Sequence, residues 1–180
     1  MSNSRLTDKI LILKARLGDK EAFTTLYNKY INRIYRFIYY KTGSKELAED
    51  LVSQSFLKLW EMIVGGGQIK VLQALLYRIA RNLVVDYYRS KQSTEVPLEY
   101  DQDAHLYDME PRLHTKIDTH LLRQTISKLK DEYKEIIVLR YVEELSIGEI
   151  AKILDKSPGN VRTICHRAIA ELKEATKDYE

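Results

Sequence analysis

The stretch LLYRIARNLVVDYYRSK, from Leu75 to Lys91, is the part of this sequence that decides its fold. Wound as an α-helix at about 100° per residue, it divides into two faces. The apolar face consists of Leu76, Ile79, Ala80, Leu83 and Tyr87. The opposite face carries cations, an amide and aromatic rings, namely Tyr77, Arg78, Arg81, Asn82, Tyr88 and Arg89. The pattern predicts a helix with one face in a core and the other exposed.

The exposed face has the chemistry of a nucleic-acid surface. Cationic side chains hold phosphates, and aromatic rings stack on unpaired bases. We therefore expect this helix to contact a nucleic acid in which some bases are unpaired. Of the three tyrosines, Tyr87 lies on the apolar arc and is expected to be structural.

Composition favours an all-α protein. The chain has 180 residues, only 3 prolines and 7 glycines, and long stretches rich in Leu, Ile, Lys and Glu. No run of 18 uncharged apolar residues predicts a transmembrane helix, and the charged N-terminus lacks the core of a signal peptide. Cys165 is the only cysteine, so it cannot form an internal disulfide. We expect a cytoplasmic protein without membrane insertion.

The N-terminal part, residues 7–92, is predicted to fold as four or five helices. Thr7 can cap the first helix and Gly18 can end it. The next helix begins at Asp19 or Lys20 and runs to Lys41. Ser44 can then cap a further helix, and Gly65–Gly67 predict a flexible break before the Leu75–Lys91 helix.

A polar linker is predicted at residues 93–113. Residues 93–111 hold six acids and no Lys or Arg, so the rest of the chain carries a net charge of +9 where the whole chain carries +3. A basic protein with an acidic insert suggests a nucleic-acid binder with a segment that imitates nucleic acid. A solvated linker kept extended by its charge explains the segment equally well. Helical periodicity returns over residues 114–176, which predict a second small helical domain.

The second domain contains the segment LSIGEIAKILDKSPGNVRTICHRAIAELK, Leu145–Lys173. Ser146 and Glu149 fit a capping box for a first helix. Asp155-Lys156 predict a short turn, after which Ser157 can cap a second helix with Pro158 at its first position. This is the spacing of a helix-turn-helix motif.

The second helix of this motif is predicted to have one buried and one exposed face. Its apolar arc consists of Val161, Ile164, Cys165, Ala168, Ile169 and Leu172. The exposed residues that would face DNA are Ser157, Gly159, Asn160, Arg162, Thr163, His166 and Arg167. Such a helix suits a major groove, although capped helix pairs with cationic outer faces also occur in ordinary bundles.

Three segments, taken together, resemble a known family. ELAEDLVSQSFLKLWE (Glu46–Glu61), the Leu75–Lys91 segment and the Leu145–Lys173 segment, in this order, resemble bacterial RNA polymerase sigma factors of the extracytoplasmic-function group, in the sigma-70 family. The resemblance covers about Phe23 to Lys173. It implies two helical domains joined by a linker, and a factor that initiates transcription at specific promoters.

The resemblance also implies roles for each segment. The first resembles the surface that binds the clamp helices of the largest subunit of core RNA polymerase, with contacts from Glu49, Asp50, Gln54, Phe56, Lys58 and Trp60. The Leu75–Lys91 helix resembles the element that melts the −10 promoter element, with Asn82 near the pocket for a flipped base. The Ser157–Leu172 helix resembles the reader of the −35 element. An anti-sigma factor is a further implied partner, and no cofactor or metal is implied.

The chain departs from the family pattern at three places. Ser53-Gln54 stands where Gln-Glu is common, Leu75 where a tryptophan is common, and Gly65–Gly67 where larger residues are common. Spacing from Phe56 also favours the core for Trp60 over an exposed contact.

Two other functions are compatible with parts of the sequence. A helix-turn-helix repressor or activator would explain Leu145–Lys173 but leave the basic, aromatic helix without a role. An enzyme is disfavoured, because adjacent carboxylates such as Glu49-Asp50 point about 100° apart on a helix. His114, Asp118 and His120 are too irregularly spaced for a metal face. We therefore expect no catalytic activity.

Overall fold

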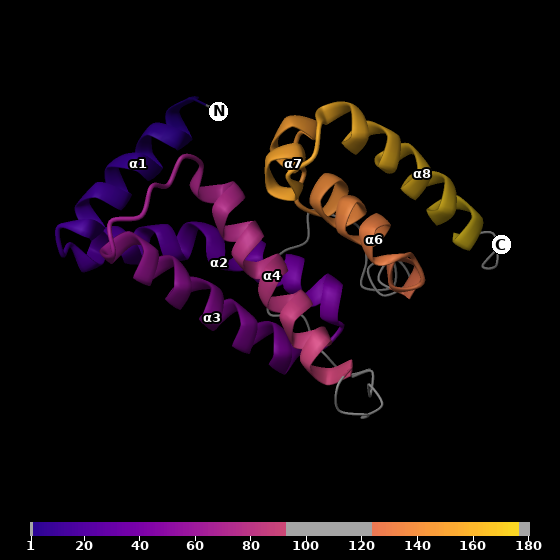
Figure 1. The fold of residues 1–180 in the computed structure, drawn as a ribbon, viewed down its shortest axis with the longest axis horizontal. Coiled ribbons are helices and arrows are strands. Elements are labelled where there is room, and N and C mark those ends of the chain that lie inside the picture. Colours follow the sequence, from indigo (N-terminus) through magenta and orange to yellow (C-terminus); the bar gives the residue numbers. More distant parts are fainter. Residues whose placement is uncertain (1, 93–123, 177–180) are drawn as a thin grey trace. The chain divides into compact units, whose positions relative to one another are not determined.

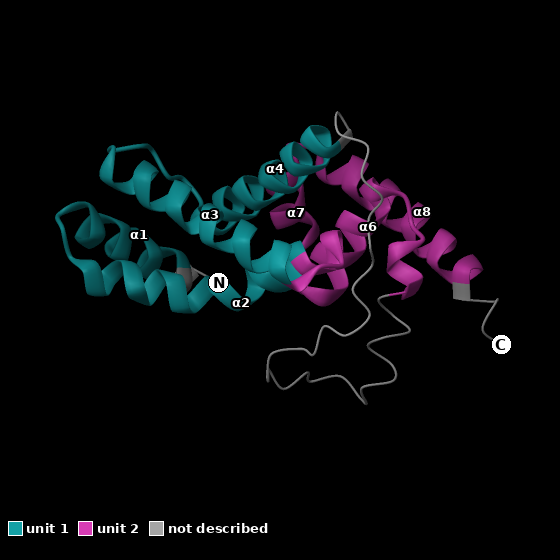
Figure 2. Ribbon diagram, turned by 90° about the horizontal axis from the view of Figure 1, so that it is seen from below, with its two compact units in different colours: residues 1–38, 46–97 teal, residues 39–45, 98–180 magenta. Residues whose placement is uncertain are grey.

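The computed structural model describes residues 2–92 and 124–176, and every regular element in these two ranges is a helix (Figure 1). The chain divides into two compact units, residues 1–38 with 46–97 and residues 39–45 with 98–180 (Figure 2). The predicted linker, residues 93–113, and the first residues of the predicted C-terminal domain lie outside the described residues. The all-α prediction is confirmed.

Unit 1 is built from four helices. They are α1 (Ser2–Arg16), α2 (Lys20–Thr42, whose end belongs to unit 2), α3 (Lys45–Val64) and α4 (Leu72–Gln92). Gly18 follows α1 at φ +93°, a conformation that L side chains rarely adopt, and so ends that helix as predicted. The Asp19 carboxylate accepts the Ala22 N–H at 3.0 Å and caps α2.

The predicted cap at Thr7 is wrong, because α1 begins at Ser2. Neither Gly nor Pro occurs in residues 2–6, so nothing local stops the helix from extending beyond Thr7. The neighbouring Asp8 has a structural role instead. Its carboxylate pairs with Lys29 Nζ and accepts the Tyr30 hydroxyl at 2.6 Å. Burial, together with this hydrogen bond, raises the pKa of Tyr30, so the phenol stays protonated and joins α1 to α2.

Aromatic pairs hold α2 against α3. Phe23 meets Trp60 with ring centroids 4.9 Å apart, and Tyr27 meets Phe56 at 4.6 Å. In each helix the two aromatic residues are four positions apart, and their order is reversed between α2 and α3. This is the pattern expected when two neighbouring helices run antiparallel. Such pairs contribute about 0.5–1.5 kcal/mol each beyond the area they bury.

The three glycines form a hydrogen-bonded end of α3. The Gly65 N–H donates to Glu61 O, and the Gly67 N–H donates to Met62 O at 2.9 Å. Arg16 of α1 donates to the carbonyls of Ile63 at 3.2 Å and Gly67 at 2.7 Å. The segment predicted as a flexible break is therefore anchored to α3 and to α1.

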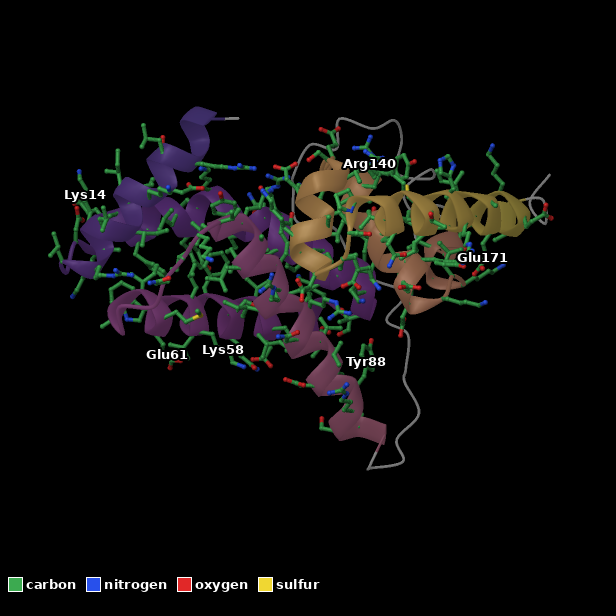
Figure 3. All side chains as sticks on the ribbon, turned by 45° about the horizontal axis from the view of Figure 1, so that its top comes forward. Lys14, Lys58, Glu61, Tyr88, Arg140 and Glu171 are labelled. Carbon is green, nitrogen blue, oxygen red and sulfur yellow. The ribbon has the colours of Figure 1, made fainter. Side chains whose placement is uncertain are left out.

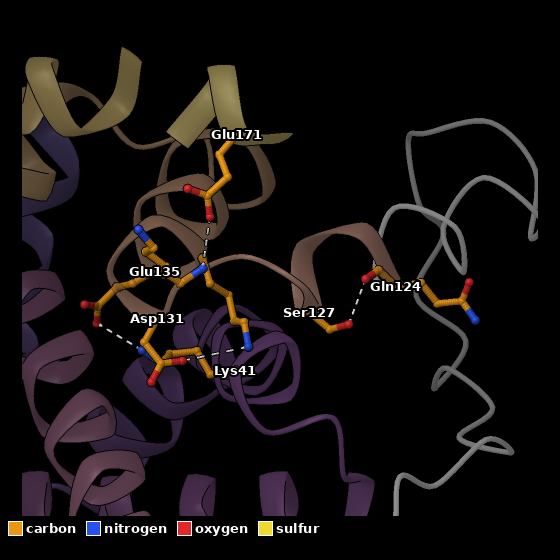
Figure 4. Close-up of polar contacts among 8 residues, drawn as sticks. Lys41, Gln124, Ser127, Asp131, Glu135 and Glu171 are labelled. Carbon is orange, nitrogen blue, oxygen red and sulfur yellow. Dashed lines mark hydrogen bonds and ion pairs between the residues drawn. The ribbon is translucent and has the colours of Figure 1, made fainter. Parts of the chain in front are cut away.

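Unit 2 contains α6 (Asp131–Ile137), the π-helix η1 (Val138–Val142), α7 (Ile147–Leu154) and α8 (Pro158–Thr176). A further helical turn covers 124–127, where the Ser127 hydroxyl donates to Gln124 O at 2.7 Å (Figure 4). Helix α8 packs against both α6 and α7. The Lys130 N–H at the start of α6 also donates to the Glu171 carboxylate of α8 at 3.4 Å.

The chain turns sharply between η1 and α7. The Arg140 guanidinium donates to Leu145 O at 2.8 Å, and the Leu145 N–H donates to Leu139 O at 3.0 Å. Glu144 takes a positive φ of 54° within this turn. These bonds fix the point where α7, the first helix of the predicted motif, begins.

Candidate nucleic-acid interface

The helix-turn-helix of unit 2 forms as its caps predict. The Ser146 hydroxyl accepts the Glu149 N–H, and the Glu149 carboxylate accepts the Ser146 N–H at 3.0 Å, so the capping box at α7 is confirmed. Asp155 ends α7 in the left-handed region, with φ 54° and ψ 45°. The Ser157 hydroxyl then accepts the Asn160 N–H at 3.2 Å, and α8 begins at Pro158.

Helix α8 has one buried and one exposed face. Val161, Ile164, Cys165 and Ala168 are buried, while Ile169 and Leu172 are half-buried. All seven residues predicted to face DNA are exposed: Ser157, Gly159, Asn160, Arg162, Thr163, His166 and Arg167. The structure therefore brings the predicted residues together on one accessible surface.

The backbone at the start of α8 is open to close approach by another molecule. A Cβ atom built at Gly159 meets no atom within 4 Å, so the protein itself does not require glycine there. The Thr163 hydroxyl donates to Gly159 O at 3.2 Å, within its own helix. Backbone N–H groups at a helix start attract phosphate, and a residue without a side chain lets a phosphate come close.

The polar face of α4 is largely where the pattern predicts it. Arg78, Asn82 and Arg89 are exposed, and Arg81 and Tyr88 are half-buried. Spacings of four and seven residues place the three exposed groups in one row along the helix. Cations therefore lie on both sides of an exposed amide.

Tyr77 does not belong to this face, and its predicted place beside the exposed arc is wrong. Its side chain is fully buried and lies edge-on to Phe37 of α2. Val84, seven residues further along the same side of α4, is also buried. The predicted apolar arc did not include Val84. Since Val84 and Tyr77 lie on the same side of α4, including Val84 would have placed Tyr77 in the core.

The end of α4 carries aromatic rings near the surface. Tyr87, predicted to be buried, is half-buried and meets Tyr88 with ring centroids 5.5 Å apart. Lys91 Nζ lies 5.1 Å from the centroid of the Tyr87 ring. Tyr88, near the end of α4, is drawn in Figure 3.

Helix α3 presents most, but not all, of the residues predicted to bind a partner. Glu49, Asp50, Gln54 and Lys58 are exposed. Trp60 is half-buried against Phe23. Part of its ring therefore packs in the core, as its spacing from Phe56 predicts, and part stays accessible to a partner. The predicted contact by Phe56 is wrong, because its ring is buried against Tyr27.

The exposed face of α3 also includes Leu57 and Glu61. The Gln54 amide donates to the Asp50 carboxylate at 2.9 Å, which orients both groups. Leu57 is 57% exposed on the same face, and Glu61, labelled near Lys58 in Figure 3, continues the face by one turn.

These observations define a class of protein. Unit 2 is a helix-turn-helix domain with an exposed cationic recognition helix. Unit 1 carries a second cationic face that includes an amide and an aromatic ring. Both features are typical of DNA-binding proteins.

Comparison with known proteins identifies the family. A family model described as Sigma-70 region 2 matches residues 26–94, and one described as Sigma-70, region 4 matches residues 119–172. SigW of Bacillus subtilis, an extracytoplasmic-function RNA polymerase sigma factor, is 30% identical over 183 residues, which cover 93% of this chain and 95% of SigW. The chain belongs to this family: it is a transcription initiation factor that directs RNA polymerase to promoters.

Further relatives extend the comparison. The sigma factor YlaC of Bacillus subtilis is 32% identical, with 89% of this chain and 96% of YlaC covered. BldN of Streptomyces coelicolor is also 32% identical, and the match covers 93% of this chain but only 65% of BldN.

Solved structures share the fold. CnrH, in complex with the cytosolic domain of CnrY, superposes with a TM-score of 0.75 at 21% identity, covering 97% of this chain and 99% of CnrH. RpoE of Bartonella quintana, in complex with the anti-sigma factor NepR, gives 0.70 at 20% identity, covering 86% of this chain and 96% of RpoE. Within the described residues, the helices are too short or too polar to cross a membrane.

Proposed function

We propose that three helix faces divide the work of promoter recognition. The exposed face of α3 around Asp50 and Gln54 binds the clamp helices of the largest polymerase subunit. The exposed face of α4 melts the −10 element, and the start of α8 reads the −35 duplex. The support is geometric: each face lies opposite a buried arc and is exposed to solvent, where a partner can reach it.

The row of Arg78, Asn82 and Arg89 on α4 is the observation that carries this proposal. A repressor that reads duplex DNA through α8 alone has no need of a second cationic face. An amide both donates and accepts hydrogen bonds, which suits the edge of a base taken out of the stack. Flanking cations hold the phosphates of the same strand, and Tyr88 offers a ring for stacking.

The remaining members of each face take supporting roles. On α4, Arg81 adds a further cation for the strand backbone. On α3, Glu49 and Lys58 add charges beside Asp50, and the accessible edge of Trp60 adds an aromatic contact. On α8, Arg162 and Arg167 are accompanied by four residues with hydrogen-bonding side chains and one glycine that leaves the backbone accessible. These are Ser157, Asn160, Thr163, His166 and Gly159.

The experiment that tests the proposal is promoter opening by an Asn82→Ala variant. The variant should bind core polymerase and −35 duplex normally, yet fail to open a fully paired promoter. A template already unpaired across the −10 element should restore much of the activity, because the cost of a few kcal/mol for extracting a base is then removed. Permanganate reactivity of thymines in the −10 region reports opening directly.

Asn32→Ala is the matched control, since Asn32 is an exposed asparagine inside α2. It should open the promoter like the parent protein. Normal opening by Asn82→Ala on the paired template would remove Asn82 from the melting surface. Failure on both templates would instead point to a general loss of binding.

We further propose that an anti-sigma factor regulates this protein by covering surfaces that polymerase or DNA would contact. RpoE, which shares the fold, was solved with an anti-sigma factor, and this supports the idea. Since its partners are polymerase and promoter DNA, we place its action in the cytoplasm. Polymerase performs all the chemistry, and this protein is not an enzyme and uses no cofactor.

A further inference from the structure

Helix α1 has two apolar faces, and the residues that the structure describes cover only one of them. Ile12 and Ala15 are buried in unit 1. On the opposite side a second apolar row is exposed: Leu6 at 59%, Ile10 at 48%, Leu13 at 57% and Leu17, just past the helix, at 89%. The spacings of four, three and four residues are those of the seam along which one helix packs against another.

The exposed row, which we call the α1 stripe (Leu6, Ile10, Leu13 and Leu17), has cations on both sides. Helical spacing puts Lys9 and Arg16 on one flank and Lys14, which Figure 3 labels, on the other. The only acid of α1 is Asp8, which is 6% exposed and already holds Lys29 and Tyr30. The exposed side of α1 therefore carries leucine and isoleucine side chains, and its charged groups are all cations.

A groove runs beside this stripe. It measures about 450 Å³ and lies between α1 and residues 67–70, with Leu13 and Arg16 on one wall and Gly67 and Lys70 on the other. Arg16 also bonds to Gly67 O, so the two walls are tied together. The apolar stripe thus borders a concave site with a cationic rim, which an added helix could fill with its own side chains.

We propose that the α1 stripe and its groove are a docking surface for an acidic amphipathic helix of a partner protein. Apolar residues of that helix would cover Leu6, Ile10, Leu13 and Leu17, and its flanking carboxylates would face Lys9 and Lys14. None of the residues assigned to polymerase or DNA binding lies on α1, so the surface is separate from the proposed promoter-recognition faces.

The same charges argue against other occupants. In a dimer made through this face, Lys9, Lys14 and Arg16 of one copy would meet a stripe with the same positive flanks, and like charges repel. Nucleic acid would satisfy the cations but would leave the leucines without an apolar partner. An anionic membrane would bind both the cations and the apolar side chains, but it would not fill a groove.

Calorimetry with a defined probe tests the proposal. The probe is a helical peptide of three heptads with Leu at positions a and d and Glu at positions e and g. It should bind the full chain, and Leu13→Ser should weaken binding about tenfold, the loss expected when one buried leucine is removed. Leu57→Ser is the matched control, because Leu57 of α3 is exposed to the same 57%, and it should bind like the parent.

A charge exchange gives an independent test. The double variant Lys9→Glu with Lys14→Glu should no longer bind the peptide with Glu at positions e and g. It should instead bind the same peptide with Lys at these positions. Lys58→Glu on α3 should not change this preference. Circular dichroism of each variant establishes that the fold is retained.

The following results would overturn the proposal. These are no binding of the Glu-flanked peptide, equal loss for Leu13→Ser and Leu57→Ser, binding to vesicles with anionic headgroups but not to the peptide, and a dimer in the parent that Leu13→Ser dissociates. Loss of core polymerase binding by Leu13→Ser would also overturn it, because the stripe would then belong to the polymerase interface.

Discussion

The ring of Tyr77 on α4 meets the ring of Phe37 on α2 edge to face, with centroids 5.3 Å apart and an angle of 89° between the planes. Both side chains are fully buried. This contact fixes α4 on α2 and turns Arg78 and Asn82 outward. A tyrosine that the pattern places among the predicted DNA contacts thus supports the exposed residues of α4 from the core.

We predict that Tyr77→Ala destabilises the fold by about 3–5 kcal/mol, the usual cost of removing a large buried ring. Urea unfolding followed by circular dichroism measures it. Tyr88→Ala should cost far less, because the Tyr88 side chain is only half-buried, yet it should impair promoter opening. Similar stability losses in the two variants would contradict this assignment.

Asp50→Arg should weaken binding to core polymerase about tenfold or more, because it reverses a charge within the proposed contact and removes the carboxylate that orients Gln54. The side chain is exposed, so helical content should not change. A pull-down with core enzyme, without DNA, measures the effect. Glu21→Arg places the same charge change on α2, outside the proposed face, and should bind normally; equal binding by both variants would move the contact away from α3.

Arg162 and Arg167 should contribute to −35 binding in distinguishable ways. Arg162 is nearer the start of α8, so we expect Arg162→Ala to cost about 1–3 kcal/mol and to relax preference at one base pair. Arg167→Ala should weaken binding to all sequences and lower the salt slope by about one. Titrations of a promoter duplex and a scrambled duplex at several salt concentrations separate the two effects. Unaltered duplex binding in both variants would exclude α8 as the reader.

Gly159→Ala should separate the stability of α8 from its approach to DNA. No atom lies within 4 Å of the added Cβ, so stability should stay equal or rise by up to about 1 kcal/mol. Binding to −35 duplex should fall if a phosphate approaches this backbone. Gly148→Ala on α7 meets equally open space and serves as the control. If both alanine variants bind DNA like the parent, the phosphate is held elsewhere.

Local rules predicted the parts of the structure that depend on neighbours in the chain. The capping box at Ser146 and Glu149, the stop at Gly18 and the start at Pro158 all involve residues within four positions of one another. For the same reason the faces of α8 were predictable, since its apolar arc follows a regular helical repeat.

The parts that failed depend on which helix lies opposite. Tyr77 is buried because α2 supplies Phe37, and Phe56 because α2 supplies Tyr27. The anchoring of Gly67 by Arg16 joins residues 51 positions apart. No periodicity within one segment contains such information, and an aromatic residue at the edge of an arc can belong to either side.

The aromatic contact of Trp60 with Phe23 and the burial of Cys165 have a practical consequence. The chain has one tryptophan and one cysteine, and unit 1 holds the first while unit 2 holds the second. Indole fluorescence therefore reports the opening of unit 1, and the rate of thiol labelling reports the opening of unit 2. The unmodified protein carries a separate natural reporter in each half, so the order in which the halves unfold can be followed without adding a probe.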